Sequence, residues 1–165
     1  MKRILLSTLL TGGMIPVAGA TDGELNQKNL SFDTAGKLAQ NVLLVCARYN
    51  HNAAVTVVDR SGTPLVTKRM DNAGPHTIEA SRMKTFTALS TRPPTDNVMK
   101  GARSGADAAS LRDIPGFLLL AGGVPVKSGG QVIGAPGVGG APGGHLDQSC
   151  ALEGLKSINK ELYAG

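Results

Sequence analysis

Few side chains in this sequence could bind or transform a ligand, and two of them share one predicted helix. His76 lies in the first turn of a segment with helical spacing, and Lys84 follows two four-residue steps later. At the helical rise, the two side chains would lie about 12 Å apart in one row. That spacing could address a large flat ligand with an anionic edge, since an imidazole can ligate a metal and an ammonium can meet a carboxylate.

Haem is one ligand of this kind. Imidazole is a common ligand of haem iron, so His76 is the candidate axial and metal ligand, and Lys84 is the candidate partner of a propionate. Ala80, Met83 and Ala88 would give the ring an apolar floor. The alternative is that His76 and Lys84 face solvent and that Ala80 packs against another subunit, and the residue pattern alone favours this alternative.

A second hypothesis is an enzyme that acts on a short carboxylic acid. Lys84 or Arg69 would hold the carboxylate, and Asp71 would move a proton. Asp71 nevertheless has the sequence context of a turn residue, because Asp71 to Pro75 is turn-rich.

The glycine-rich turn from Gly140 to Gly144 is a third candidate. Its free backbone N–H groups could hold an anion, with His145 as an additional donor. Asp147 lies in the first turn of the helix that follows and could satisfy those N–H groups itself. This structural interpretation is the one that the sequence favours.

Several familiar sites are excluded by inspection. The glycine-rich segment contains neither a P-loop nor a dinucleotide-binding pattern between a strand and a helix. In the stretch from Gly101 to Gly105 the serine stands one place too late for a nucleophile elbow. None of the three histidines begins an H-x-x-x-H pattern, so a structural zinc site is not expected.

The first twenty residues have the three regions of a secretory signal peptide. Lys2 and Arg3 precede an apolar run, and Ala18-Gly19-Ala20 is a small-residue cleavage site. The apolar run is shorter than the roughly 20 residues that span a bilayer. We therefore expect a mature domain over residues 21–165 that is periplasmic or secreted and does not span the membrane.

Charge and aromatic content argue against nucleic acid as a partner. The formal charge of +5 falls to +3 when Lys2 and Arg3 leave with the leader, and the remaining basic residues are scattered among acids. Tryptophan is absent and other aromatic residues are scarce, so few side chains could stack on bases.

The two cysteines, Cys46 and Cys150, leave two possibilities open. An oxidising compartment allows a disulfide, which would close a loop of about 105 residues. Two separate buried thiols are an equally acceptable interpretation.

Hydrophobic periodicity predicts an α+β domain with one mostly antiparallel sheet of about five strands and its terminal helices on one face. In that arrangement Cys46 and Cys150 would lie on neighbouring helices. The expected helices cover residues 31–49, 76–90, 95–101 and 145 onward, and the expected strands cover 54–58, 64–70, 117–121, 124–126 and 131–133.

Five motifs resemble those of the GlcG/HbpS family, which includes haem-binding and haem-degrading proteins and relatives in the C-terminal domain of PduO proteins. They are Val57-Val58-Asp59-Arg60-Ser61-Gly62, Arg69-Met70-Asp71, Ala80 to Ala88 with Lys84, Gly122-Gly123-Val124-Pro125, and Ile133-Gly134 through Gly144. The sequence departs from the family pattern at Ala135-Pro136 and at His145.

The resemblance implies a profilin-like fold, assembly into homo-oligomers and, in some members, haem binding with a role in storage, breakdown or redox sensing. Lys84 matches a family motif, whereas the assignment of His76 as a ligand comes from its position in this sequence. A sensor subunit that contacts a membrane kinase is a third class of function that the sequence leaves open.

Overall fold

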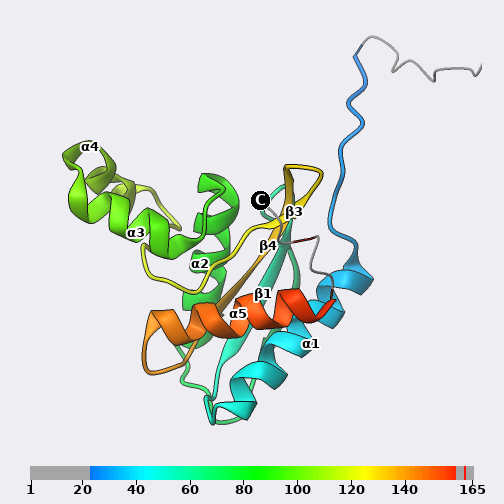
Figure 1. Ribbon diagram of the computed structural model, residues 1–165, viewed down its shortest axis with the longest axis vertical. Helices are drawn as coiled ribbons and strands as arrows, with labels where there is room; N and C mark the ends of the chain where they lie inside the picture. Colours follow the sequence, from blue (N-terminus) through cyan, green and yellow to red (C-terminus); the bar gives the residue numbers. More distant parts are fainter. Residues whose placement is uncertain (1–22, 159–161, 163–165) are drawn as a thin grey trace, which may run out of the picture.

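The structure, a computed structural model, describes residues 23–158 and 162 as one α+β unit (Figure 1). The predicted signal peptide, residues 1–20, lies outside the described residues. No helix in the described part of the chain has the length and apolar character needed to cross a membrane. The elements, in chain order, are α1 (Phe32–Arg48), β1 (Ala54–Asp59), β2 (Pro64–Arg69), α2 (Thr77–Thr91), α3 (Thr95–Ser104), α4 (Ala106–Ala109), the 3₁₀ turn η1 (Ser110–Asp113), β3 (Val126–Ser128), β4 (Gln131–Gly139) and α5 (Gly144–Ile158).

The four strands form one antiparallel sheet in the order β2-β1-β4-β3. β1 is central and pairs along its whole length with β4, from Ala54 opposite Gly139 to Asp59 opposite Gly134. The turn between β1 and β2 is held by the Asp59 carboxylate, which accepts hydrogen bonds from the backbone N–H groups of Ser61 and Thr63 at 2.8 and 3.0 Å. Both predicted hairpins are present, although the strands of the second are β3 (Val126–Ser128) and the longer β4 (Gln131–Gly139) rather than residues 124–126 and 131–133.

The expected strand at residues 117–121 is wrong, so the sheet has four strands rather than about five. The segment runs along α2 instead of joining the sheet. The ring of Phe117 packs edge-on against Phe86, with centroids 5.8 Å apart, and the backbone N–H of Leu118 donates to the Thr87 hydroxyl at 2.9 Å. An apolar run can satisfy its burial against a helix as well as within a sheet, and its periodicity does not distinguish the two cases.

One face of the sheet carries both terminal helices, α1 and α5, as the sequence predicts (Figure 1). Their contact faces are aliphatic: α1 packs on β1 and β2, and α5 packs on β4. A disulfide between Cys46 and Cys150 joins the two helices, with a Cα–Cα distance of 5.3 Å. The fully buried side chains of this layer include Leu38, Val42, Cys46, Val55, Val57, Val138, Cys150, Ala151 and Leu155.

The opposite face is covered by α2, which packs on β4 and β1. The approach is close because β4 presents glycine there: a Cβ added to Gly137 would lie 2.6 Å from the backbone nitrogen of Thr85. Any larger residue would push the helix away from the sheet.

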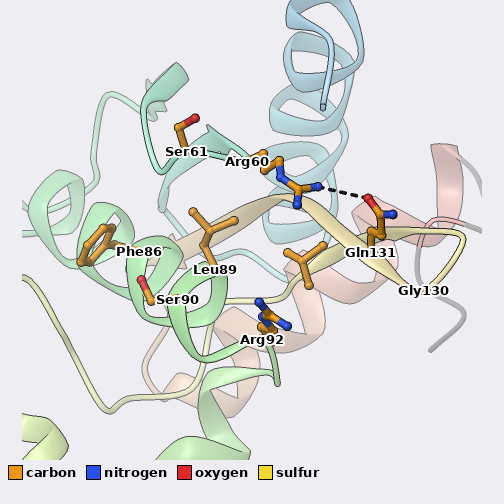
Figure 2. A pocket seen from close by; sticks show the side chains of 9 residues that line it. Arg60, Ser61, Phe86, Leu89, Ser90, Arg92, Gly130 and Gln131 are labelled. Atoms are coloured by element: carbon orange, nitrogen blue, oxygen red, sulfur yellow. Dashed lines mark hydrogen bonds between the residues drawn. The ribbon is translucent and has the colours of Figure 1, made fainter. Parts of the chain in front are cut away.

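α2 ends at Arg92, whose backbone adopts the left-handed conformation with φ of 76°. Its N–H donates to the carbonyl of Ala88 at 2.9 Å and closes the last turn. Pro93 and Pro94 then prevent continuation of the helix. The side chain of Arg92 extends from this end of α2 (Figure 2).

Candidate functional site

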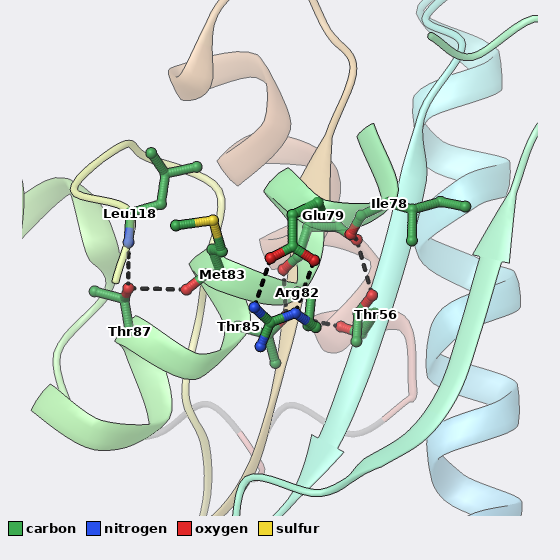
Figure 3. A network of polar contacts seen from close by, with 9 residues as sticks. Thr56, Ile78, Glu79, Arg82, Met83, Thr85, Thr87 and Leu118 are labelled. Carbon is green, nitrogen blue, oxygen red and sulfur yellow. Dashed lines mark hydrogen bonds and ion pairs between the residues drawn. The ribbon is translucent and has the colours of Figure 1, made fainter. Parts of the chain in front are cut away.

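The face of α2 that packs on the sheet is lined by hydroxyl groups. The Thr85 hydroxyl oxygen lies 2.9 Å from the carbonyl of Thr56 and 2.7 Å from that of Ser81, so that its one proton is shared between two acceptors, and the hydroxyls of Ser81 and Thr56 lie 2.8 Å apart (Figure 3). Each of these three residues is buried. The polar groups therefore satisfy one another between helix and strand, which offsets the cost of removing them from water.

Lys84, which the sequence predicts as a partner of an anionic ligand, belongs to this buried face. Its side chain is 1% exposed and its ammonium donates to the Asp147 carboxylate at 2.6 Å. The stem of Lys84 passes Gly122, where an added Cβ would lie 3.0 Å from the lysine Cδ. The charge that a propionate or a short carboxylic acid would need is already paired inside the fold.

Besides its ion pair with Lys84, Asp147 makes a hydrogen bond to the turn that precedes α5. Its second carboxylate oxygen accepts the backbone N–H of Ala141 at 2.9 Å. The structural interpretation of the turn over residues 140–144 is therefore confirmed, because the aspartate occupies an N–H group that an anion would otherwise use. Burial raises the pKa of the Asp147 carboxyl above its ordinary value, and the neighbouring Lys84 charge and the two hydrogen bonds oppose that rise.

The other predicted site residues lie at the start of α2 and on β2, and they do not line a common cavity with Lys84. His76 is exposed at the N-cap position, with its imidazole against Gly74. Arg69 is exposed and donates to the carbonyl of Ala73 at 2.7 Å. Ala80 and Met83 are half-buried. The structure separates these residues because Lys84 turns inward while His76 stays in solvent.

A histidine does lie in a cleft elsewhere, between α3 and α5. This cleft, termed the α3–α5 cleft, has a volume of about 480 Å³. Its residues are Asp96, Met99, Lys100, Arg103, Leu120, Ala121, Gly144, His145, Gln148, Ser149 and Leu152. It combines an imidazole, two cationic side chains and an apolar wall. Its volume falls in the range of small-molecule and cofactor sites, about 300–1,000 Å³.

The polar end of the α3–α5 cleft is organised around Asp96. Burial by itself would raise the pKa of Asp96, but hydrogen bonds from Lys100 and Gln148 outweigh it and hold the pKa below its ordinary range. Lys100 lies 3.1 Å from the carboxylate. The Gln148 amide donates to Asp96, and its carbonyl Oε1 is buried without a hydrogen-bond partner among the described residues. A bound ligand with a donor group could satisfy that oxygen.

Sequence reasoning named His145 but missed the rest of the α3–α5 cleft. The signal that could have found it is the spacing of Met99, Lys100 and Arg103, which places an apolar side chain and two cations on neighbouring positions of one helix. Pairing that helix with the start of α5 requires knowledge of the tertiary fold. The sequence predicts Leu120 in a buried strand, whereas in the structure its side chain is 40% exposed and lines the cleft.

Comparison with known proteins bears on nearly the whole of this fold. A family model described as "Haem degrading protein HbpS-like" matches residues 30–156. The crystal structure of a double mutant of HbpS from Streptomyces reticuli is 36% identical to this chain. The similarity covers 90% of this chain and 99% of that one, with a TM-score of 0.80.

Two other relatives are more distant. An uncharacterized 15.0 kDa protein of Citrobacter freundii, from the dhaT-dhaS intergenic region, is 32% identical over 113 residues, which cover 67% of this chain and 80% of the relative. The structure of a PduOC:heme complex is 22% identical, covers 79% of this chain and 96% of that one, and has a TM-score of 0.72. At this identity the second likeness extends to the fold alone.

Proposed function

The chain belongs to the HbpS-like haem-degrading family, and from that premise we propose that it binds haem in the α3–α5 cleft, where His145 would hold the iron. The observation that carries the proposal is the presence of an imidazole, an apolar wall and two cations in one cleft of about 480 Å³. The structure of the PduOC:heme complex, which shares the fold, supports a haem-related ligand.

The residues of the cleft match the chemistry of a haem. An imidazole such as that of His145 is a common ligand of haem iron. Met99, Leu120 and Leu152 offer apolar contact to a porphyrin face, and Arg103 offers a guanidinium to a propionate carboxylate. When bound, the haem would supply redox or oxygen chemistry, while the side chains of the cleft bind and orient it.

An absorption titration with hemin tests the proposal. We expect the purified protein to shift and sharpen the Soret band at a stoichiometric ratio, and His145→Ala to weaken or abolish that change, because the axial bond is lost. His51→Ala is the matched control, since His51 is half-buried and lies outside the α3–α5 cleft. His145→Ala with an unchanged spectrum would overturn the assignment of the cleft.

His76→Ala distinguishes this site from the one that the sequence predicts. A spectrum altered by His76→Ala and not by His145→Ala would move the ligand to the start of α2, beside Arg69, Ala80 and Met83. Spectra followed over time with oxygen and a reductant separate two roles: the band persists in a protein that stores haem and decays in one that degrades it.

We also propose that the mature protein is exported to the periplasm or secreted and that it forms homo-oligomers. The leader-like residues 1–20 and the Cys46–Cys150 disulfide support export, since disulfides persist in oxidising compartments. Self-association is supported by exposed apolar side chains such as Ile78, 42% exposed on α2. Cell fractionation tests the first proposal, and light scattering after size exclusion tests the second. A cytoplasmic product or a monomer would contradict them.

A further inference from the structure

A second hollow lies at the C-terminal end of α2, on the side of the molecule formed by the two hairpin turns (Figure 2). Its volume is about 430 Å³, and it is termed the two-arginine pocket. Arg60 enters it from the turn after β1, and Arg92 enters it from the end of α2. The remaining lining residues are Ser61, Phe86, Leu89, Ser90, Gly130, Gln131 and Val132.

Among the residues that the structure describes, no carboxylate forms an ion pair with either guanidinium group of this pocket. Within the described residues, the Arg60 guanidinium donates to two neutral oxygens, the Gln131 side-chain carbonyl at 3.2 Å and the Lys28 backbone carbonyl at 3.4 Å. Arg92 has no side-chain partner within the described part of the chain. The adjacent acid, Asp59, directs its carboxylate to the N–H groups of the β1–β2 turn and does not line the pocket. Two cationic side chains and no acidic one therefore line this hollow within the described part of the chain.

One wall of the pocket is apolar. In the view of Figure 2, Leu89 lies to the left of Arg60 and Arg92, and Phe86 lies farther to the left; Val132 also lines the pocket. The hydroxyls of Ser61 and Ser90 lie at the margin. A bare inorganic anion would use the charges but not the apolar wall, whereas an anion with a short hydrocarbon part would use both.

The backbone of Arg92 is a further sign that this side chain is retained for a ligand. A left-handed φ of 76° is favourable for glycine and costly for an arginine. A helix that needs only a C-cap at this position would be served better by glycine. Strained non-glycine residues cluster at binding sites, where the side chain compensates for the strain.

We propose that the two-arginine pocket binds a small organic carboxylate, with a short dicarboxylate as the preferred ligand. Planar guanidinium groups match carboxylates in geometry, and two of them suit a ligand with two carboxylates on a short aliphatic chain. The apolar wall contacts the chain between the carboxylates. This site uses none of the residues of the α3–α5 cleft and goes beyond haem binding.

Calorimetric titration with succinate, butyrate and inorganic phosphate at low salt tests the proposal. We expect saturable binding of succinate, weaker binding of butyrate and the weakest binding of phosphate. Arg92→Gly should reduce the affinity for succinate by about tenfold or more, because a charge-assisted hydrogen bond is lost. Its thermal midpoint should equal or exceed that of the wild type, since glycine accepts the left-handed backbone. Arg48→Gln, on α1 and outside the pocket, is the matched control and should leave the affinity unchanged.

Three outcomes would overturn the proposal. They are the absence of saturable binding up to about 20 mM succinate, an unchanged affinity in Arg92→Gly, and phosphate binding as tight as that of succinate. Hemin spectra of Arg92→Gly separate this result from the proposed function. They should match those of the wild type, just as His145→Ala should keep its affinity for succinate.

Discussion

The two faces of the sheet are held by different kinds of interaction. On the α1/α5 face, aliphatic side chains such as Val42, Val57 and Leu155 exclude water, and the Cys46–Cys150 disulfide joins the two helices. On the α2 face, the helix packs closely on the glycines of β4. Hydroxyl hydrogen bonds and the buried Lys84–Asp147 ion pair join the elements there. The free energy of the apolar contacts is roughly proportional to the buried area and does not depend on direction. The polar contacts stabilise the fold only when every hydrogen-bonding or charged partner is present.

Lys84 and Asp147 also connect the two layers. Lys84 comes from α2, on one face, and Asp147 comes from the first turn of α5, on the other. Both side chains are almost fully buried, at 1% and 4% exposure. Such a pair contributes little net stability compared with an apolar replacement, but removal of one partner leaves an uncompensated charge.

Loss of Lys84 is therefore the largest effect that we expect. Lys84→Met should lower the free energy of unfolding by about 3–5 kcal/mol, because the Asp147 carboxylate stays buried without its counter-charge. Asp147→Asn should lower the free energy of unfolding by a similar amount, because the Lys84 ammonium then stays buried without its counter-charge. The double variant should lose less than the sum of the two, which a double-mutant cycle from urea denaturation measures. A loss under about 1 kcal/mol in Lys84→Met would contradict the account of the α2 face.

The same variant has a predicted pH dependence. Lys84 opposes the rise that burial causes in the Asp147 pKa, so its removal raises that pKa further. The native state then binds more protons than the unfolded chain, and stability increases as the pH falls. Denaturation at about pH 7 and about pH 5 should show that Lys84→Met regains part of its loss at the lower pH, relative to the wild type. Adding Asp147→Asn should abolish that gain, and a gain that persists would assign it to another group.

The disulfide provides the next largest effect, on the aliphatic face. Cys46→Ala with Cys150→Ala should lower the free energy of unfolding by about 2–4 kcal/mol, chiefly because the unfolded chain gains freedom. Reduction of the wild-type protein is the control: an equal loss on reduction assigns the effect to the cross-link. A loss in the alanine variant alone would assign it to the cavities left by the two sulfur atoms.

Gly137→Ala tests the close approach of α2 to the sheet. An added Cβ would lie 2.6 Å from the Thr85 backbone nitrogen, so the helix must shift, at a cost of about 2–3 kcal/mol. Gly36→Ala is the matched control, because a Cβ there meets nothing within 4 Å and alanine favours a helix. Thermal denaturation should show a lower midpoint for the first variant and an equal or higher midpoint for the second. The reverse order would place α2 farther from β4 than the structure does.

The smallest effect should come from the solvent side of α2. Arg82 donates two hydrogen bonds to Glu79, at 2.5 and 2.9 Å, which hold the pKa of Glu79 below its ordinary value (Figure 3). The two side chains are 41% and 59% exposed, so solvent screens the pair. Glu79→Gln should change the free energy of unfolding by less than about 0.5 kcal/mol in urea denaturation. A change above about 1 kcal/mol would contradict this expectation, because the exposed pair would then contribute to stability on the scale of the buried contacts.

The contrast between the faces also explains which elements the sequence could predict. α1 and α5 repeat Leu38, Val42, Ala151 and Leu155 at helical spacing, so their contact face and their common layer follow from periodicity. The segment at residues 117–121 has no period, and its apolar run packs along α2 instead of joining the sheet. The cleft residues Arg103 and His145 lie on α3 and α5, which are far apart in the sequence. No local sequence pattern predicts that these two helices line one cleft.

By itself, the sequence determined the α+β class, the hairpins, the shared face of the terminal helices and the placement of Cys46 and Cys150 on neighbouring helices, because these features follow from local periodicity and turn chemistry. Only the tertiary structure decided that Lys84 turns inward to Asp147 and that His145, rather than His76, lies in a cleft with cations and apolar walls. The physical reason is that a polar residue on a helix can face water or a buried partner, and only the three-dimensional arrangement of the other elements supplies that partner.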